Sequence, residues 1–270
     1  MKGRRIAGLL MCALALTIAA CGGDDDEDAA TDFTSAANDL CTEQAQEVAV
    51  TFRETGVSTA STPEEAQLLQ AERSQARLDI REEYAPRFEA LEPPTEFSEQ
   101  WDQYLELSEE GRQLSADLIA ASESGDLEEA ARLSEESSAI NDERVAVLEE
   151  IGGLDSCAAI LPEEDVAEIE AAIETYETTN DPAQCTEVVT EDFVESQFGG
   201  VDRCEQFQEK LDPSDLATAI ECEEVEGVAG VSAEATCTPE GGRFDGQTGD
   251  YQMFYEDGAW KLFEAAEAPE

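Results

Sequence analysis

The stretch YQMFYEDGAWKLF, residues 251–263, predicts a β-hairpin and therefore a sheet. Asp257-Gly258 is a strong signal for a two-residue turn, because the preferred hairpin turn needs residues that tolerate positive φ. Residues on either side of the turn alternate between the two faces of a sheet. We expect one face to carry the pairs Tyr255–Trp260 and Met253–Leu262, and the other face to carry the pairs Phe254–Lys261 and Gln252–Phe263.

Two further strands are expected before this hairpin, which makes four strands near 217–226, 230–238, 249–256 and 259–265. If Ala229-Gly230 is the loop between the first two strands, Cys222 lies directly opposite Cys237. Residues that face each other across an antiparallel pair are close enough for a cross-strand disulfide.

The segment 33–161 has helical periodicity and predicts four amphipathic helices, the first over 35–54. Thr62-Pro63 is a cap with proline at the first helical position, and Gly125-Asp126 ends one helix and caps the next. Short connections favour antiparallel neighbours. The predicted fold class is therefore α+β, with an antiparallel four-helix bundle over 33–161 and a small α+β domain with a curved antiparallel sheet over 162–270.

The N-terminus predicts export and attachment to a membrane. Three basic residues precede an apolar run from Ile6 to Ala20, which is typical of a secretory signal over 1–20. Ile18-Ala19-Ala20-Cys21 resembles the lipobox of bacterial lipoproteins. The resemblance implies that Cys21 carries the lipid, with acyl chains such as palmitate, and that the mature protein faces the extracytoplasmic side of the cell membrane. Residues 21–32 are expected to form an acidic tether.

Six cysteines follow Cys21, and an even number in an exported chain indicates disulfides. The start of the first helix and the end of the fourth lie at the same end of an up-down bundle, which favours a bond between Cys41 and Cys157. With Cys222 and Cys237 paired across two strands, the remaining cysteines join two helical segments. The predicted pairs are Cys41–Cys157, Cys185–Cys204 and Cys222–Cys237.

The C-terminal segment resembles a known fold family. The helix from Gln184-Cys185 to Val194 and the hairpin motif Glu256 to Leu262 resemble the ketosteroid-isomerase-like cone fold of the nuclear transport factor two superfamily. In such folds the concave sheet often forms a ligand pocket. The resemblance implies candidate pocket residues Tyr251, Met253, Tyr255, Trp260 and Leu262, or on the opposite face Phe254 and Phe263. The alternative is that these side chains fill the core.

Composition limits the function classes. After residue 20 the chain has 12 Arg and Lys against 66 Asp and Glu, a net charge of −54, which excludes nucleic acid as a natural partner. There is no histidine, so Ser-His-Asp and Cys-His sites are excluded. No phosphate-binding glycine motif occurs. We expect no cofactor and no metal.

These observations favour a non-catalytic binding or interaction module on the membrane. The expected partner is an envelope protein, a polysaccharide or a small apolar molecule. The alternative is a small isomerase-like enzyme that uses a buried carboxylate in the C-terminal domain, for which no residue is assigned. A structural spacer in the envelope is a third hypothesis.

Overall fold

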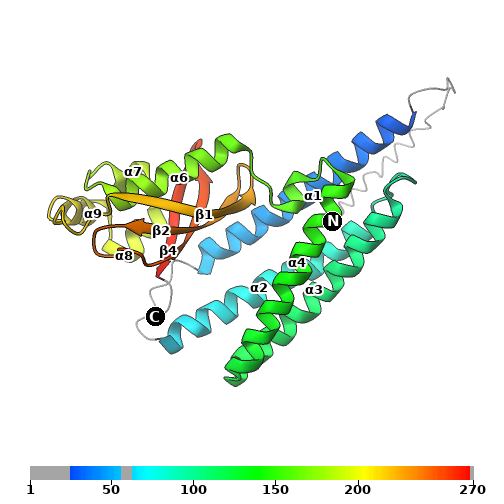
Figure 1. Cartoon of the computed structure of the whole chain (residues 1–270), viewed down its shortest axis with the longest axis horizontal. Coiled ribbons are helices and arrows are strands. Elements are labelled where there is room, and N and C mark those ends of the chain that lie inside the picture. The colour runs from blue at the N-terminus through cyan, green and yellow to red at the C-terminus, as the bar shows by residue number, and fades with distance from the viewer. Residues whose placement is uncertain (1–24, 56–62, 268–270) are drawn as a thin grey trace, which may run out of the picture.

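The structure, a computed structural model, describes residues 25–55 and 63–267. It is a mixed α+β protein in which the long helices precede an antiparallel sheet (Figure 1). The predicted signal segment 1–20, the lipid-carrying Cys21 and the predicted cap Thr62 lie outside the described residues. Within those described ranges, no helix combines the length and the apolar character that crossing a membrane requires.

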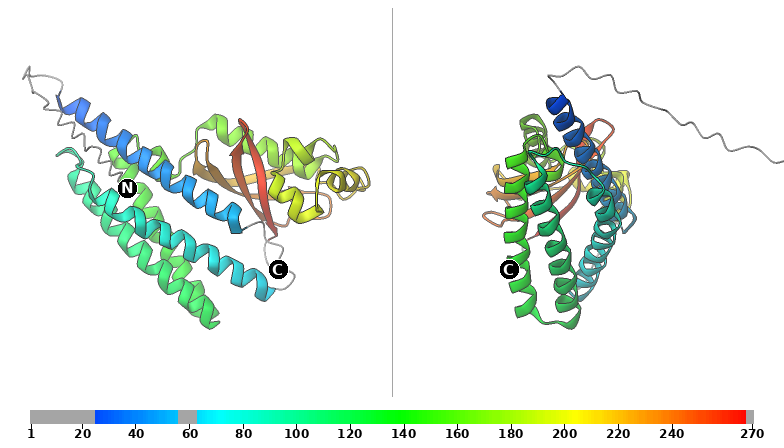
Figure 2. Two further views of the ribbon diagram at one scale, coloured as in Figure 1. Left: turned by 180° about the vertical axis from the view of Figure 1, so that it is seen from behind. Right: turned by 90° about the vertical axis from the view of Figure 1, so that its right-hand side faces the viewer.

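The first part of the described chain consists of long helices, and each packs against the next one along the sequence. Helices α3 (Ser98–Ser124) and α4 (Leu127–Ile151) run side by side in Figures 1 and 2. The helices are α1 (Asp25–Thr55), α2 (Pro63–Glu89), α3 (Ser98–Ser124), α4 (Leu127–Ile151) and the short α5 (Asp155–Ala158).

An aromatic cluster forms the core between these helices. Trp101 is 1% exposed, stacks on Tyr104 with 4.7 Å between ring centroids and meets Phe33 edge-on at 5.0 Å. Phe88 of α2 packs against the same two rings of α3. The cluster therefore joins α1, α2 and α3 around Trp101.

Helix α1 begins earlier than the sequence analysis expected. It starts at Asp25, inside the predicted tether 21–32 and ahead of the predicted start near residue 35. The prediction rested on mutual repulsion within the acidic run. Negative residues in the first turns of a helix also interact favourably with the helix dipole, so the same run can extend a helix at its N-terminus. The predicted tether segment is therefore helical from Asp25 onward.

The ends of α3 and α4 follow local sequence signals. Gly125 has a φ of 75° directly after α3, a conformation that side chains with a Cβ rarely adopt. The Asp126 carboxylate then accepts a hydrogen bond from the Glu129 backbone N–H at 3.2 Å. This N-cap is the one expected from the sequence.

The second part of the chain is a group of shorter helices followed by the sheet. The helices are α6 (Glu163–Thr178), α7 (Gln184–Glu187), α8 (Glu191–Phe198) and α9 (Val201–Gln208). The strands lie in chain order and pair antiparallel: β1 (Ala219–Val228), β2 (Ser232–Glu240), β3 (Gly249–Glu256) and β4 (Ala259–Glu267).

The β3–β4 hairpin has the predicted register near its turn and a different one beyond it. Tyr255 pairs with Trp260 and Met253 with Leu262, as expected from the Asp257-Gly258 turn. Gln252, however, pairs with Glu264 and not with Phe263. A β-bulge adds one residue to β4 at this point. Phe263 then packs on Phe254, with 4.6 Å between the ring centroids.

The β1–β2 hairpin has the predicted cysteine pairing but a different loop length and register near its turn. Three residues, 229–231, connect Val228 to its partner Ser232, where the sequence analysis expected two. A bulge between Cys222 and Glu224 compensates for the extra residue. Cys222 therefore still lies opposite Cys237.

Three disulfides join the pairs that the sequence predicted. One links α1 to α5 across a sequence separation of 116, a second links α7 to α9, and the third crosses β1 and β2. The pairs are Cys41–Cys157, Cys185–Cys204 and Cys222–Cys237.

Helices cover both faces of the sheet. Helix α6 contacts β1 and β4, the two outermost strands, so the sheet curves around it (Figure 1). We call this the inner face; it carries Met253 and Leu262. The C-terminal half of α1 lies against the opposite, outer face, where Arg53 stacks over Phe254 at 4.6 Å.

Helix α1 belongs to two hydrophobic cores. Its Phe33 and Ala37 pack with the long helices, whereas Ala49 and Phe52 pack with the sheet. The predicted division at residue 162 separates the long helices from the sheet along the chain but does not separate the two cores.

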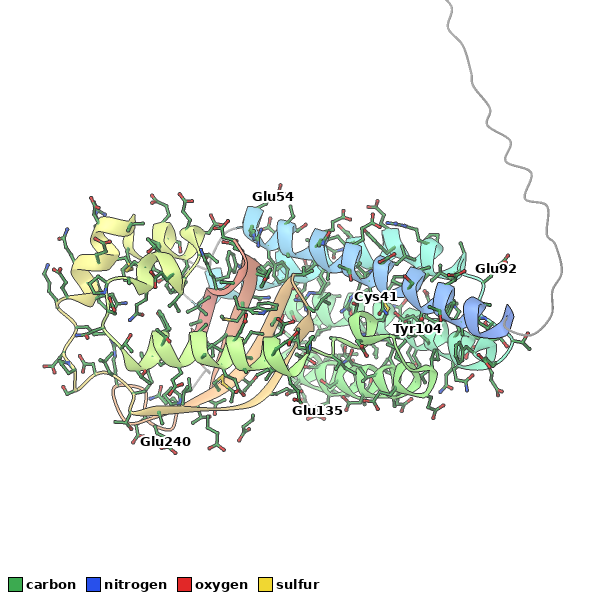
Figure 3. All side chains as sticks on the ribbon, turned by 90° about the horizontal axis from the view of Figure 1, so that it is seen from above. Cys41, Glu54, Glu92, Tyr104, Glu135 and Glu240 are labelled. Carbon is green, nitrogen blue, oxygen red and sulfur yellow. A yellow bond between two sulfur atoms is a disulfide. The ribbon has the colours of Figure 1, made fainter. Side chains whose placement is uncertain are left out.

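Acidic side chains cover the outside of the molecule. Figure 3 shows Glu54, Glu92, Glu135 and Glu240 at its periphery, and all four are exposed. Positions that repel one another are thus spread over the surface, where water and salt screen them.

Candidate functional site

The candidate pocket residues on the inner face are mostly core residues. Met253 and Leu262 have no exposed surface, and Trp260 is 3% exposed. Ile169 and Ile173 of α6 are also fully buried in the same cluster and occupy the centre of the curved sheet. The predicted pocket at this position is therefore filled.

The other candidates are divided among different surroundings. Tyr255 is 37% exposed and packs edge-on against Trp260. Phe254 and Phe263 have no exposed surface and lie on the outer face. Tyr251, which is 5% exposed, lines an open cavity at one end of the inner face.

This cavity, about 340 Å³ in volume, lies between α6, α8, α9 and the far ends of β2 and β3. That volume falls within the range of pockets that bind small molecules. Six aromatic side chains line it, and we call it the aromatic cavity: Tyr176, Phe193, Phe198, Phe207, Phe244 and Tyr251.

Phe207 is the unusual member of this set because it is 49% exposed. It packs on Phe198 with 5.3 Å between ring centroids, and Phe198 in turn packs on Phe193. Phe207 lies three residues after Cys204, whose disulfide ties α9 to α7. A covalently held helix thus presents an aromatic side chain at the edge of the cavity.

A carboxylate and a phenol pair inside the cavity. The Tyr251 hydroxyl donates a hydrogen bond to Glu177 Oε1 at 2.9 Å. Burial raises the pKa of Glu177, and the hydrogen bond from Tyr251 partly opposes that rise in pKa. Burial is also the largest cause of the raised pKa of the Tyr251 hydroxyl, followed by the charge of Glu177. The pair is therefore partly buried, with Tyr251 as the donor.

Gln208 also lines this cavity, with a buried side chain. Gln208 is 5% exposed, and its side-chain oxygen has no hydrogen-bond partner among the described residues. Unsatisfied buried acceptors are uncommon in folded proteins. With its aromatic lining and a hydrogen-bonded acid, the cavity can hold a small apolar molecule.

Sequence reasoning found Tyr251 and missed the rest of this site. Glu177 lies at the end of α6 and Phe207 on α9, and no spacing in the sequence relates either of them to β3. The available signal was the Cys204–Phe207 spacing, which places Phe207 about one turn from a disulfide anchor. That signal indicates a fixed position but not a cavity.

Comparison of the chain with protein-family models, curated proteins and solved structures finds no match. Among the described residues there is also no group of three or more acidic or cysteine side chains arranged to hold a metal ion.

Proposed function

We propose that this chain is an exported lipoprotein, anchored through Cys21, whose folded part binds a small apolar molecule in the aromatic cavity without catalysis. The observation that carries the proposal is the open cavity itself, with Phe207 half exposed at its edge. A ligand that covers this exposed aromatic side chain gains binding free energy, because its binding removes apolar surface from solvent.

The proposal includes a finer description of the fold. The long helices form an antiparallel bundle that holds the binding part away from the membrane, and residues 163–267 form a small variant of the cone fold. The successive packing of α1 to α4 supports the first statement, and the curvature of the sheet around α6 supports the second.

Ligand binding is tested by titrating the protein with the neutral dye N-phenyl-1-naphthylamine and following its fluorescence. We expect Phe207→Ala to weaken binding by about tenfold, because a buried aromatic contact contributes on the order of 1.5–3 kcal/mol. Tyr255→Ala is the matched control, since Tyr255 is also an exposed aromatic residue but lies outside the cavity. Equal losses in both variants would refute the assignment.

Anchoring is tested separately by mass spectrometry of the exported protein. A residue 21 that carries acyl chains supports the proposal, and an unmodified thiol contradicts it. Pull-down from envelope extracts, with Cys21→Ser as the control, tests the other expected partners, an envelope protein or a polysaccharide.

A second candidate function is supported by the Glu177–Tyr251 pair. A carboxyl group with a raised pKa, hydrogen-bonded to a phenol inside an apolar cavity, is suited to moving a proton to and from carbon. An isomerase-like enzyme would exchange the protons next to the carbonyl of 2-cyclohexenone with D₂O, and Glu177→Gln would abolish the exchange. Absence of exchange by the wild type, measured by NMR, would favour the non-catalytic function.

A further inference from the structure

A second cavity lies on the other side of the sheet. It has a volume of about 240 Å³ and lies between α1, α2, α4, α5 and the outer face of β1, β2 and β3. Figure 3 shows Cys41 and Tyr104, which form part of its wall, between the helices. We call it the arginine cavity after three residues that line it: Arg77, Arg81 and Arg144. Only 12 basic residues follow residue 20 in the whole chain, so this concentration is notable.

The three guanidinium groups differ in how they are satisfied. Arg77 forms an ion pair with Glu234 at 3.2 Å. Arg144 donates a hydrogen bond to Asn141 Oδ1 at 2.7 Å, but its buried Nε has no partner among the described residues. The Arg81 side chain makes neither an ion pair nor a hydrogen bond with any part of the chain that the structure describes.

Arg81 is also the most desolvated of these groups. Burial, followed by repulsion from Arg144 and Arg77, lowers the pKa of Arg81 to about 10. Its side chain keeps some accessible surface because it borders the cavity, and protein surrounds it elsewhere. At neutral pH the group therefore still carries its charge, and burial removes part of the water around it.

Two carboxylates border the same cavity, and they do not neutralise Arg81. Glu234 is paired with Arg77. Burial raises the pKa of Glu226, repulsion from Glu234 and Glu224 adds to that rise, and Arg144 and Arg77 oppose it. No ion pair joins Glu226 to a described residue. Three cationic groups thus face one paired and one unpaired acid.

Two neighbouring arginines between the helices and the outer face of the sheet form ordinary ion pairs. Arg53 pairs with Glu256 at 3.0 Å, and Arg73 pairs with Glu264 at 2.6 Å. A buried charge without a partner costs free energy, so arginines with a purely structural role are expected to pair in this way. Arg81 departs from that pattern.

We propose that the arginine cavity binds a small organic anion. The carboxylate or phosphate head of the ligand would accept hydrogen bonds from Arg81 and Arg144, because a guanidinium group matches both heads in a two-point geometry. The apolar body would lie against Val48 and Val145, partly exposed side chains that line the same cavity. This site is separate from the aromatic cavity and extends beyond the proposed function.

The anion would enter through a larger groove. A groove of about 1010 Å³ runs between α2, α3 and α4, and the three arginines line this groove as well as the cavity. The groove therefore leads from the surface to the guanidinium groups.

Isothermal titration calorimetry of the full mature protein tests the proposal with four probes: phenylacetate, phenyl phosphate, inorganic phosphate and the neutral 2-phenylacetamide. We expect the organic anions to bind at least tenfold more tightly than the amide, and whichever of the two binds better identifies the head group. Arg81→Gln is expected to weaken anion binding at least tenfold. Arg132→Gln is the matched control, because Arg132 is an exposed arginine of α4 that pairs with Glu129 and Glu136 outside the cavity.

Thermal unfolding without ligand separates this role from charge balance. If the role of Arg81 is to bind an anion, Arg81→Gln leaves the melting temperature of the ligand-free protein unchanged or raises it, because the substitution removes a charge that no ion pair compensates. A fall in melting temperature together with no anion binding by the wild type would overturn the proposal. The proposed function is tested independently of this result. If the neutral dye still binds and Phe207→Ala still weakens that binding, the aromatic cavity binds ligand even though the arginine cavity does not.

Discussion

The inner and outer faces of the sheet are covered by helices in chemically different ways. On the inner face, α6 contributes apolar residues and two hydrogen bonds, one from Tyr251 to Glu177 and one from Trp260 to Asp165. On the outer face, α1 and α2 contribute three ion pairs around the buried ring of Phe254. The inner cavity is accordingly aromatic and the outer cavity cationic.

The two kinds of contact correlate with how far each helix lies from the sheet along the chain. Helix α6 belongs to the same continuous segment as the sheet, and non-directional apolar packing is enough to hold it there. Helices α1 and α2 come from a distant segment, and paired charges add a preferred orientation to their docking. The long helices therefore cover the outer face of the sheet in addition to packing with one another.

The largest expected effect concerns the disulfide that holds α1. Replacing both Cys41 and Cys157 by alanine should lower the free energy of unfolding by about 4–5 kcal/mol, because the bond closes a loop of 116 residues. Guanidinium unfolding followed by circular dichroism measures the loss. Hydrogen exchange should rise more on the outer face than on the inner face.

The matched control for this variant is the short loop in the sheet. Removing Cys222 and Cys237 together should cost about 3 kcal/mol, because their sequence separation is only 15. A larger loss from the short loop than from the long one would contradict the view that the long loop anchors the cover of the outer face.

The next prediction compares adjacent residues of β3 on opposite faces. Phe254→Ala should cost about 3–5 kcal/mol, close to the cost of Met253→Ala at about 2–5 kcal/mol, because both side chains are fully buried. Urea unfolding provides both values. If α1 did not cover the outer face, Phe254→Ala would cost far less than Met253→Ala.

A smaller effect is expected from the ion pairs of the outer face. Glu264→Gln should cost about 1.5–3 kcal/mol, because its pair with Arg73 is largely buried, with 13% and 15% of the side chains exposed. Glu234→Gln should cost only about 0–1 kcal/mol, since its pair with Arg77 is more exposed. Double-mutant cycles at low and high salt distinguish them, and equal coupling energies would be inconsistent with this ranking.

The smallest effect is a pH dependence on the inner face. Burial raises the pKa of Glu177 in the folded protein, so its contribution to stability is fully present below the pKa of the unfolded chain and is lost as pH rises through the folded pKa. Glu177→Gln keeps an acceptor for Tyr251 and carries no charge. We therefore expect it to match the wild type in acid and to be more stable at neutral pH. Thermal melts across that range would show no divergence if Glu177 were not desolvated.

Local signals in the sequence predicted much of this structure. The Asp257-Gly258 turn aligned β3 with β4 near the turn, and Gly125-Asp126 separated α3 from α4. These features depend on the conformational preferences of a few adjacent residues. The bulges at Phe263 and Glu223 were missed because they depend on how the strands pack and not on their composition.

The candidate site was predicted only in part. Tyr251 was expected in a pocket and lines one, but Met253, Trp260 and Leu262 fill the core that α6 closes. Alternation within a strand assigns residues to a face, and it contains no information on which part of that face a helix will leave open.

The sequence by itself determined the helices, the hairpins and the three cysteine pairs, because these depend on short-range preferences or on few alternatives. Tertiary structure alone decided that α1 serves two cores, that Arg81 has no ion-pair partner among the described residues, and that Phe207 borders an open cavity. Each of these features depends on the meeting of segments far apart in the chain, where shape and charge must be satisfied together and no local pattern records the outcome.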